Sequence, residues 1–244
     1  MVKIGYNYGK DYHYSELPFL PVRLFKLLDL LSIDTKQILK TMTSSGTSGQ
    51  AVSKIYLDSI TSSNQTKILS KIVSSYIGKK RVPMMIIDSE SILNDRKKFS
   101  ARGAGILGFS MFGKNRIFAL NPNMDLNEDL VLQFLEEHKN ENIFIFGFTF
   151  MVWKHFYKEI IKRNISVNLS NATLIHGGGW KKLLKESVST FEFKKALHKL
   201  FKIKNVFDYY GMVEQTGSIY MECKNGYLHS SIFSDILIRK VNNF

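Results

Sequence analysis

The sequence of this 244-residue chain predicts an α/β fold with a mainly parallel sheet. Apolar runs of strand length alternate with stretches of helix length through the middle of the chain, which is the pattern of consecutive strand–helix–strand units. Glycine-rich or polar segments follow several of the apolar runs, where loops beyond the strands are expected. The chain is long enough to bury a core, and its 44% of hydrophobic residues is typical of a globular protein.

The expected elements follow from local patterns. A short helix is expected over 21–28, because proline suits a first helical turn. Asp58 is expected to cap a helix that runs to about Ile77. The other expected helices span 125–138, 150–162 and 191–201, and the expected strands span 82–88, 142–148, 172–175 and 206–210. Three short strands, 218–223, 227–231 and 236–239, are expected to pair around a turn at Asn225-Gly226.

The bulk composition narrows the class of protein. The net charge is +13, but the 34 basic residues are spread along the chain and form only short clusters, which favours a solvated lysine-rich surface over nucleic-acid binding. The apolar runs are too short to span a bilayer, and the N-terminus lacks the apolar core of a signal peptide. A single cysteine, Cys223, excludes an internal disulfide and a cysteine-rich zinc site. A cytoplasmic protein without a membrane span is expected.

A hydroxyl- and glycine-rich segment is the first candidate binding site. It consists of Thr43, Ser44, Ser45, Gly46, Thr47, Ser48 and Gly49. Glycines let a backbone approach an anion closely, and hydroxyl groups add donors, so this loop is a candidate for wrapping a polyphosphate. No Gly-Lys-Ser/Thr follows, so the segment is not a Walker A loop. A flexible surface loop of the same composition is the alternative interpretation.

Two further candidates follow apolar strands. His176, Gly177, Gly178 and Gly179 close the expected strand 172–175. Tyr210 ends the expected strand 206–210, and Gly211 and Glu214 follow it. Ligands of open α/β sheets bind beyond the carboxyl ends of the strands. The glycines would admit a flat ring or an acyl chain, a tyrosine ring can stack on a purine, and a carboxylate can bind a Mg²⁺ that bridges phosphate oxygens. His176 is a candidate base, although a histidine at a strand end is more often a structural residue.

Gly103, Gly105 and Gly108 match the dinucleotide-binding pattern G-x-G-x-x-G, but their surroundings do not fit it. That pattern requires a strand directly before the glycines and a helix directly after them. A polar segment precedes the glycines, and the following residues, 109–113, are not expected to be helical. The glycines are therefore interpreted as permitting tight packing or a bend.

Several segments together resemble a known family. The three candidate segments occur in the same order in the adenylate-forming superfamily. A closer resemblance, to the LuxE acyl-protein synthetases, rests on five segments that run over nearly the whole chain. These are Pro18–Lys26, Phe99–Ala104, Phe146–Phe150, His176–Lys181 and Tyr210–Gln215. The stretch from Glu222 to His229 also resembles phenylacetate-CoA ligases.

This resemblance implies a function and a set of site residues. The implied activity is ATP-dependent activation of a carboxylic acid to an acyl-adenylate, with a fatty acid as the expected substrate, followed by transfer to a thiol of a protein or of CoA. Residues 43–49 would hold the ATP phosphates, and Gly177 to Gly179 with Tyr210 and Gly211 would surround the adenine and the acyl group. Glu214 would organise Mg²⁺. A reductase or a carrier protein is the implied partner in a complex.

The chain also departs from the superfamily pattern. Superfamily loops usually continue Gly-x-Pro-Lys, whereas Gly49 is followed by Gln50-Ala51-Val52-Ser53-Lys54. Residues 1–244 are expected to be a partial large domain, incomplete at both termini and without the small C-terminal domain that carries a catalytic lysine. Cys223 does not correspond to the acyl-accepting cysteine of the luminescence synthetases. The alternatives are a phenylacetate-type acyl- or aryl-CoA ligase, and a noncatalytic remnant that only binds nucleotide or a partner chain.

Overall fold

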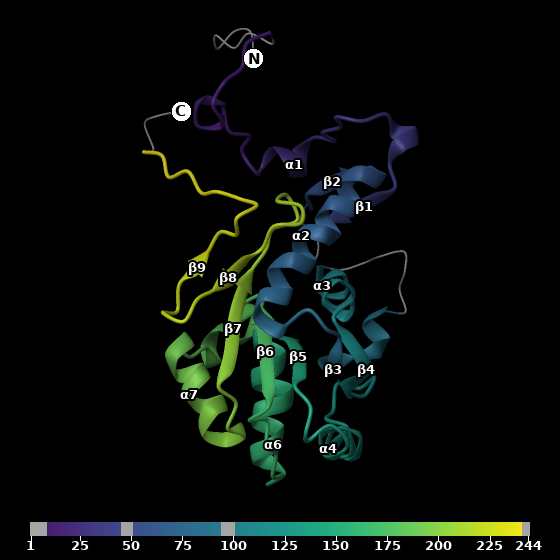
Figure 1. The fold of residues 1–244 in the computed structure, drawn as a ribbon, viewed down its shortest axis with the longest axis vertical. Helices are drawn as coiled ribbons and strands as arrows, with labels where there is room; N and C mark the ends of the chain where they lie inside the picture. The colour runs from purple at the N-terminus through teal and green to yellow at the C-terminus, as the bar shows by residue number, and fades with distance from the viewer. Residues whose placement is uncertain (1–8, 45–50, 94–100, 241–244) are drawn as a thin grey trace.

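A computed structural model describes residues 9–44, 51–93 and 101–240 of the chain, and it contains a mainly parallel sheet. The strand order is β4-β3-β5-β6-β7-β8-β9 (Figure 1). The parallel strands are β3 (Val82–Ser89), β4 (Gly113–Leu120), β5 (Ile143–Phe148), β6 (Ala172–Gly177) and β7 (Asn205–Tyr210). Two short strands, β8 (Tyr220–Glu222) and β9 (Leu228–His229), extend the sheet in antiparallel pairing. The α/β fold with a mainly parallel sheet is therefore confirmed.

Helices cover both faces of the sheet. Helices α2 (Ser59–Ile77) and α3 (Ala101–Ser110) lie on one face, where Tyr76 packs edge-on against Phe207 and Phe109 stacks on Phe146. The other face carries the continuous helical segment Thr149–Lys162 and α7 (Thr190–Phe201). That segment consists of α5 (Thr149–Met151), a π-helical stretch (Val152–Tyr157) and α6 (Lys158–Lys162), while α4 (Glu128–Glu137) packs beside β4.

The direction of chain travel reverses between β3 and β5. From β3 the chain moves outward to β4, then returns past β3 to β5 and continues through β6 to β7. The carboxyl ends of these parallel strands share one edge of the sheet, at the upper end in Figure 1. In open sheets of this kind, that edge is where ligands bind.

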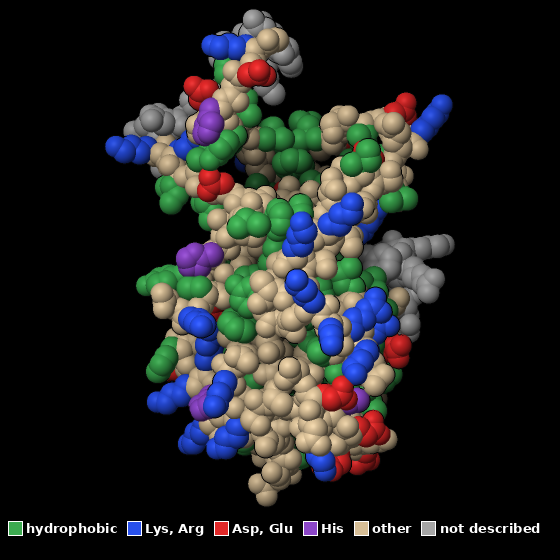
Figure 2. All heavy atoms as spheres, viewed as in Figure 1, with side chains coloured by type: hydrophobic (Ala, Val, Ile, Leu, Met, Phe, Trp, Pro, Cys, Tyr) green, Lys and Arg blue, Asp and Glu red, His purple; other side chains and the backbone are tan. Residues whose placement is uncertain are grey.

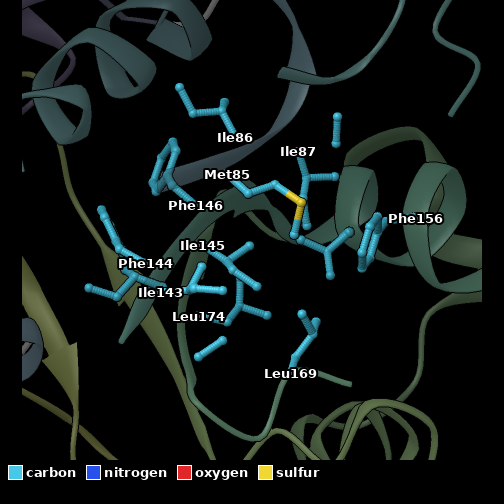
Figure 3. Packing of buried hydrophobic residues seen from close by; sticks show 14 of the residues in the cluster. Met85, Ile86, Ile87, Ile143, Phe144, Ile145, Phe146, Phe156, Leu169 and Leu174 are labelled. Carbon is cyan, nitrogen blue, oxygen red and sulfur yellow. The ribbon is translucent and has the colours of Figure 1, made fainter. Parts of the chain in front are cut away.

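The core lies between the sheet and its helices. Aliphatic and aromatic side chains from β3, β5 and β6 meet there, including Ile86, Phe146 and Leu174 (Figure 3). The aromatic side chain of Phe156 reaches this cluster from the helical segment after β5 (Figure 3). The strands are apolar on both faces because helices cover both faces, as expected for a parallel sheet.

Smaller elements lie outside this sheet. An antiparallel hairpin, β1 (Lys40–Thr43) and β2 (Lys54–Leu57), precedes α2. The N-terminal part contains the short helix α1 (Leu24–Leu27). Short 3₁₀ helices span Tyr14–Glu16, Thr35–Gln37, Glu90–Leu93 and Lys181–Glu186. None of the described helices is long and apolar enough to cross a membrane. Figure 2 shows basic side chains spread over much of one face of the molecule, among acidic and apolar ones.

Most expected elements are present, although some bounds differ and some elements were not predicted. Asp58 caps α2 through a hydrogen bond from the Thr61 amide, as predicted. Helix α4 begins at Glu128, three residues later than predicted, because Asn127 caps it. Strands β1, β2 and β4 and helix α3 were not predicted, and residues 236–239 are not a strand. The prediction that residues 109–113 are non-helical is wrong for Phe109 and Ser110, since α3 runs to Ser110.

The glycines of the G-x-G-x-x-G match lie inside α3 rather than in a loop between a strand and a helix. A Cβ at Gly105 would lie 3.2 Å from the ring of Phe148 and 3.6 Å from the hydroxyl of Tyr209. The glycine therefore lets α3 approach the sheet closely. This confirms the packing interpretation and excludes the dinucleotide-binding one.

Candidate functional site

The site is built on the adjacent carboxyl ends of three parallel strands. Strand register places Phe148 of β5 beside Gly177 of β6, and Gly177 beside Tyr209 of β7. The polar or glycine-rich segments that follow these strands therefore leave the sheet side by side. Two of the three candidate segments, those beginning at His176 and Tyr210, are brought to one edge in this way.

The turn after β6 passes between two aromatic side chains. A Cβ at Gly177 would lie 2.6 Å from both the ring and the carbonyl oxygen of Tyr209, and one at Gly178 would lie 2.6 Å from the ring of Phe148. Gly178 and Gly179 have φ values of +76° and +62°, and nothing lies within 4 Å of the Cβ position of Gly179. The first two glycines are thus required by contact, and the third leaves backbone open to a ligand.

His176 is buried behind this turn. The residue is 2% exposed, its ring lies 4.7 Å from that of Phe193, and its Nδ1 lies 3.0 Å from the hydroxyl of Thr149. Burial, aided by the charge of Lys194, lowers the pKa of His176 to about 3, so the imidazole is neutral at physiological pH. A buried neutral imidazole of this kind is better suited to holding the turn than to accepting a proton from substrate.

Asp208 lies close to His176, and Glu222 lies beside Asp208. The carboxylate of Asp208, on β7, lies 3.8 Å from Nδ1 of His176. Burial and the neighbouring Glu222 raise the pKa of Asp208 to about 6. Glu222 is buried but well satisfied, because it accepts hydrogen bonds from Nζ of Lys194 (2.6 Å) and from the Asp208 amide (2.8 Å). This group ties α7 to β7 and β8 directly behind the edge.

An accessible tyrosine ring lies at the end of β7, just before the loop to β8. Tyr210 is 50% exposed, and its ring centroid lies 6.1 Å from that of Tyr220. Glu214 lies in the same loop, partly exposed, inside the turn that the hydrogen bond from the Gln215 amide to the Met212 carbonyl closes. Within the described ranges, no ion pair engages Glu214. The ring and the carboxylate are therefore both available to a ligand.

The β1–β2 hairpin carries the hydroxyl- and glycine-rich segment. Thr43 ends β1, and the Ser44 amide donates to the Ser53 carbonyl (3.1 Å) while the Ser44 hydroxyl accepts from the Ser53 amide (2.9 Å). Ser45, Gly46, Thr47, Ser48 and Gly49 lie outside the described residues. The hairpin thus fixes Ser44 and Ser53, on either side of the residues that are not described.

Helix α2 connects the hairpin to the loop after β7. Nε2 of Gln65 lies 3.2 Å from the sulfur of Met42 on β1. Gln65 also contacts the loop after β7. Gly217 of that loop, with φ +82°, packs so closely on Gln65 that a Cβ at Gly217 would lie 2.6 Å from Cα of Gln65. The segments containing Thr43 and Glu214 therefore flank one helix, although they are about 170 positions apart in the sequence.

Mg²⁺ and ATP fit the residues at this edge. No group of three or more histidine, cysteine or acidic side chains suited to a metal occurs in the part of the chain that the structure describes. Mg²⁺ commonly needs only one or two carboxylates when substrate phosphates supply other ligands, so Glu214 alone satisfies that requirement. The open backbone at Gly179 and the exposed ring of Tyr210 are suited to a nucleotide.

Sequence reasoning missed several polar residues behind the edge. They are Thr149, Lys194, Asp208 and Glu222. Asp208 could have been found from the sequence, because it is an acidic residue inside a run that is otherwise mostly apolar. No comparable signal marks Thr149 or Lys194, because their contacts depend on the register of β5 and β6 and on the packing of α7.

A separate cavity of about 610 Å³ lies beside the edge strand β4 and its neighbour β3. Its walls include Ile86, Leu107 and Phe118, with Ser89 and Ser110 among the polar residues. None of the predicted site residues lines it. The predicted site is accordingly an open edge of the sheet, distinct from this cavity.

Comparison with solved structures supports the fold. The structure is similar to that of a 2-hydroxyisobutyryl-CoA ligase in complex with 2-HIB-AMP and CoA, with a TM-score of 0.54 and 14% identity over 80% of this chain and 38% of that one. ATP-bound MatB from Rhodopseudomonas palustris (TM-score 0.48, 13% identity, 78% and 32% covered) and coronafacic acid ligase from Pectobacterium brasiliense (0.42, 16%, 69% and 29%) are also similar. This chain spans less than two fifths of the length of each of these ligases.

Comparison of sequences adds the family. The search of curated proteins gives no significant match. The family described as "Acyl-protein synthetase, LuxE" matches residues 10–243, which is nearly the whole chain. The match includes the turn after β6 and the loop after β7. The chain belongs to the LuxE acyl-protein synthetase family.

Proposed function

We propose that this protein activates a carboxylic acid with ATP, as part of an acyl-protein synthetase. A carboxylate oxygen would form a bond to the α-phosphorus while the bond between the α- and β-phosphates breaks, giving acyl-adenylate and pyrophosphate. The observation that carries this proposal is the meeting of the Gly177–Gly179 turn and the Tyr210–Glu214 segment at the ends of adjacent strands. Membership of the acyl-protein synthetase family supports it.

Each segment has a proposed role at the edge. The half-exposed ring of Tyr210 would stack on the adenine, and the open backbone of Gly177–Gly179 and Gly211 would allow the nucleotide and the acyl group to approach. Residues 43–49 would hold the phosphates, and Glu214 would hold Mg²⁺, which neutralises charge on the phosphate oxygens when bound. Positioning and charge neutralisation would supply most of the rate enhancement.

We further propose a fatty acid as the substrate and a thiol as the acceptor. The thiolate would attack the acyl carbonyl carbon, a thioester would form, and AMP would leave. Family membership favours a protein thiol, with a reductase or a carrier protein as the partner that supplies it. CoA is the competing acceptor.

ATP–pyrophosphate exchange tests the first step. The purified protein should catalyse exchange only when a carboxylic acid is present, and a panel of short, long and aromatic acids identifies the preferred class. Glu214→Gln should abolish the exchange, while Glu137→Gln, on the solvent side of α4, should leave it unchanged. Absence of exchange with every acid, while ATP still binds, would favour a noncatalytic nucleotide-binding protein.

The acceptor requires a second assay with the preferred acid. Thioester formation with CoA would assign the protein to the phenylacetate-type ligases, whereas hydroxylamine-sensitive labelling of a protein would assign acyl-protein transfer. Cys223→Ser distinguishes labelling of this chain from labelling of a partner, because Cys223 is its only cysteine.

A further inference from the structure

Thr149 occupies a position where three buried polar groups meet. It begins the helical segment after β5 and is 6% exposed. Its hydroxyl lies 3.0 Å from Nδ1 of His176 and 3.1 Å from the carbonyl oxygen of Gly177. The Thr149 hydroxyl, just after β5, therefore contacts two consecutive residues at the end of β6, His176 and Gly177.

The chemistry of these groups determines which of them donates and which accepts each hydrogen bond. A hydroxyl has one proton, and a carbonyl oxygen can only accept. If Thr149 donates to Gly177, the threonine oxygen must accept from Nδ1–H of His176. The neutral imidazole then carries its proton on Nδ1, and Nε2 is an acceptor.

The alternative order is less favourable. If Thr149 donated to Nδ1 instead, the proton of His176 would lie on Nε2. That nitrogen is buried, and it has no hydrogen-bond partner within the described residues. A buried N–H without an acceptor is rarer in folded proteins than an under-used acceptor, and it is costly. When Thr149 donates to the Gly177 carbonyl, the only unused group is the lone pair on Nε2 of His176.

This arrangement sets the path of the glycine turn. The Gly177 carbonyl is held by Thr149 on one side, while Tyr209 and Phe148 fill the space where side chains of Gly177 and Gly178 would lie. The backbone of Gly177 and Gly178, which leads into Gly179, is thereby held by contacts with three residues. Because the turn is the part of the edge nearest the proposed ligand, its direction decides how a ligand is oriented.

We infer that Thr149 is a positioning residue, whose hydroxyl links the Nδ1–H of His176 to the Gly177 carbonyl and so orients the Gly177–Gly179 turn for acid activation. The positioning part of this inference rests on the proposed function. The hydrogen-bond order and the tether on the turn do not, and they are measurable without activity.

Nuclear magnetic resonance tests the hydrogen-bond order directly. Long-range ¹H–¹⁵N spectra of protein labelled in its six histidines report which ring nitrogen carries the proton, and His176→Asn identifies the His176 signals. Wild type and Thr149→Ser should show a proton on Nδ1 and a bare Nε2. A proton on Nε2 in the wild type would overturn the inference.

A matched pair of substitutions tests the tether. Thr149→Val keeps the shape of the side chain but removes the hydroxyl, and Thr149→Ser keeps the hydroxyl. Backbone amide resonances of Gly178 and Gly179 should move in the valine variant and stay near their wild-type positions in the serine variant. His176→Asn, which retains a donor close to the position of Nδ1, should also preserve them. Equal shifts in the serine and valine variants would contradict the tether.

Exchange activity tests the positioning role. At saturating ATP and acid, Thr149→Val should lose on the order of 10²-fold in the rate of ATP–pyrophosphate exchange, while Thr149→Ser retains most of it. Equal rates for the two folded variants would remove the positioning role. If the wild type shows no exchange, the proposed function and the positioning role both fail, and the histidine spectra still decide the hydrogen-bond order.

Discussion

At the scale of single residues, β6 ends in a glycine, Gly177, because a side chain there would collide with Tyr209, not because the backbone needs to be flexible. A Cβ at Gly177 would lie 2.6 Å from the carbonyl oxygen of Tyr209, so Gly177→Ala must move backbone. We expect a loss of about 1–3 kcal/mol in the free energy of unfolding, measured with urea, and a loss of acid-dependent exchange.

Gly78→Ala is the matched control for this substitution. Gly78 ends α2 with φ +87° in open space, at the opposite edge of the sheet, so alanine there costs stability through backbone strain alone. It should lower the free energy of unfolding by about 1–3 kcal/mol and leave exchange intact. Equal activity in the two variants would show that the path of the turn after β6 does not matter.

The buried imidazole predicts a dependence of stability on pH. The pKa of His176 is about 3 in the folded state, while the unfolded residue titrates near 6.5, so the unfolded state binds the additional proton between these values. Stability should therefore fall as the pH drops from 6.5 towards 3, by up to about 1.4 kcal/mol per pH unit. Asp208, whose pKa is raised to about 6, opposes this between pH 6 and 4.

Comparison of wild type with His176→Asn isolates the histidine contribution. Chemical unfolding at pH 7, 6 and 5 should show that the wild type loses stability relative to the variant as the pH falls. Parallel curves would mean that His176 titrates normally in the folded protein.

Single residues also show what the sequence could and could not predict about the site. The position of Gly177 to Gly179 and of Tyr210 at the carboxyl-end edge of the sheet was predictable, because they stand at the ends of apolar runs of strand length. The burial of His176 was not predictable, since it depends on Phe193 of α7 packing against the ring. The contact between Thr149 and Gly177 depends on the register of β5 with β6, which no local pattern specifies.

At the scale of elements, one ion pair joins α3 to the end of β3. Arg102 donates to both carboxylate oxygens of Asp88, through Nε at 2.5 Å and through a terminal nitrogen. Asp88 is 1% exposed, so removing the arginine leaves a buried carboxylate without its charged partner. Arg102→Met should cost about 3–5 kcal/mol in the free energy of unfolding.

A second substitution distinguishes loss of the pair from loss of packing. Asp88→Asn in the Arg102→Met background removes the unpaired charge and should recover much of the stability. A double-mutant cycle from urea unfolding measures this coupling. Strict additivity of the two substitutions would show that the pair does not join the elements.

The elements differ in how well the sequence predicts them. The continuous apolar runs of β3 and β5 and the capped helix α2 were predictable from pattern. Strand β4 was not, because its first half, Gly113-Lys114-Asn115-Arg116, is polar on an edge strand that is open to solvent. The β1–β2 hairpin was missed for a related reason, since its strands are short and only half-buried.

At the scale of the whole molecule, the fold gathers distant segments around the carboxyl ends of β6 and β7. Parallel pairing aligns the turn after β6 with the loop after β7, and α2 holds the β1–β2 hairpin near that loop through Gln65. The order of motifs in the sequence indicated a shared site. Their meeting at one edge follows from the strand order, which depends on long-range pairing.

The central claim is that a nucleotide binds at this edge, and calorimetric titration of ATP with Mg²⁺ tests it most directly. Tyr210→Ala should weaken binding on the order of tenfold or more by removing the stacking surface, because Tyr210 is 50% exposed at the end of β7. Tyr227→Ala is the matched control, since Tyr227 is 70% exposed on the β8–β9 hairpin, and this variant should bind like the wild type. Equal affinity of all three proteins for ATP, or equal weakening in both variants, would contradict the claim.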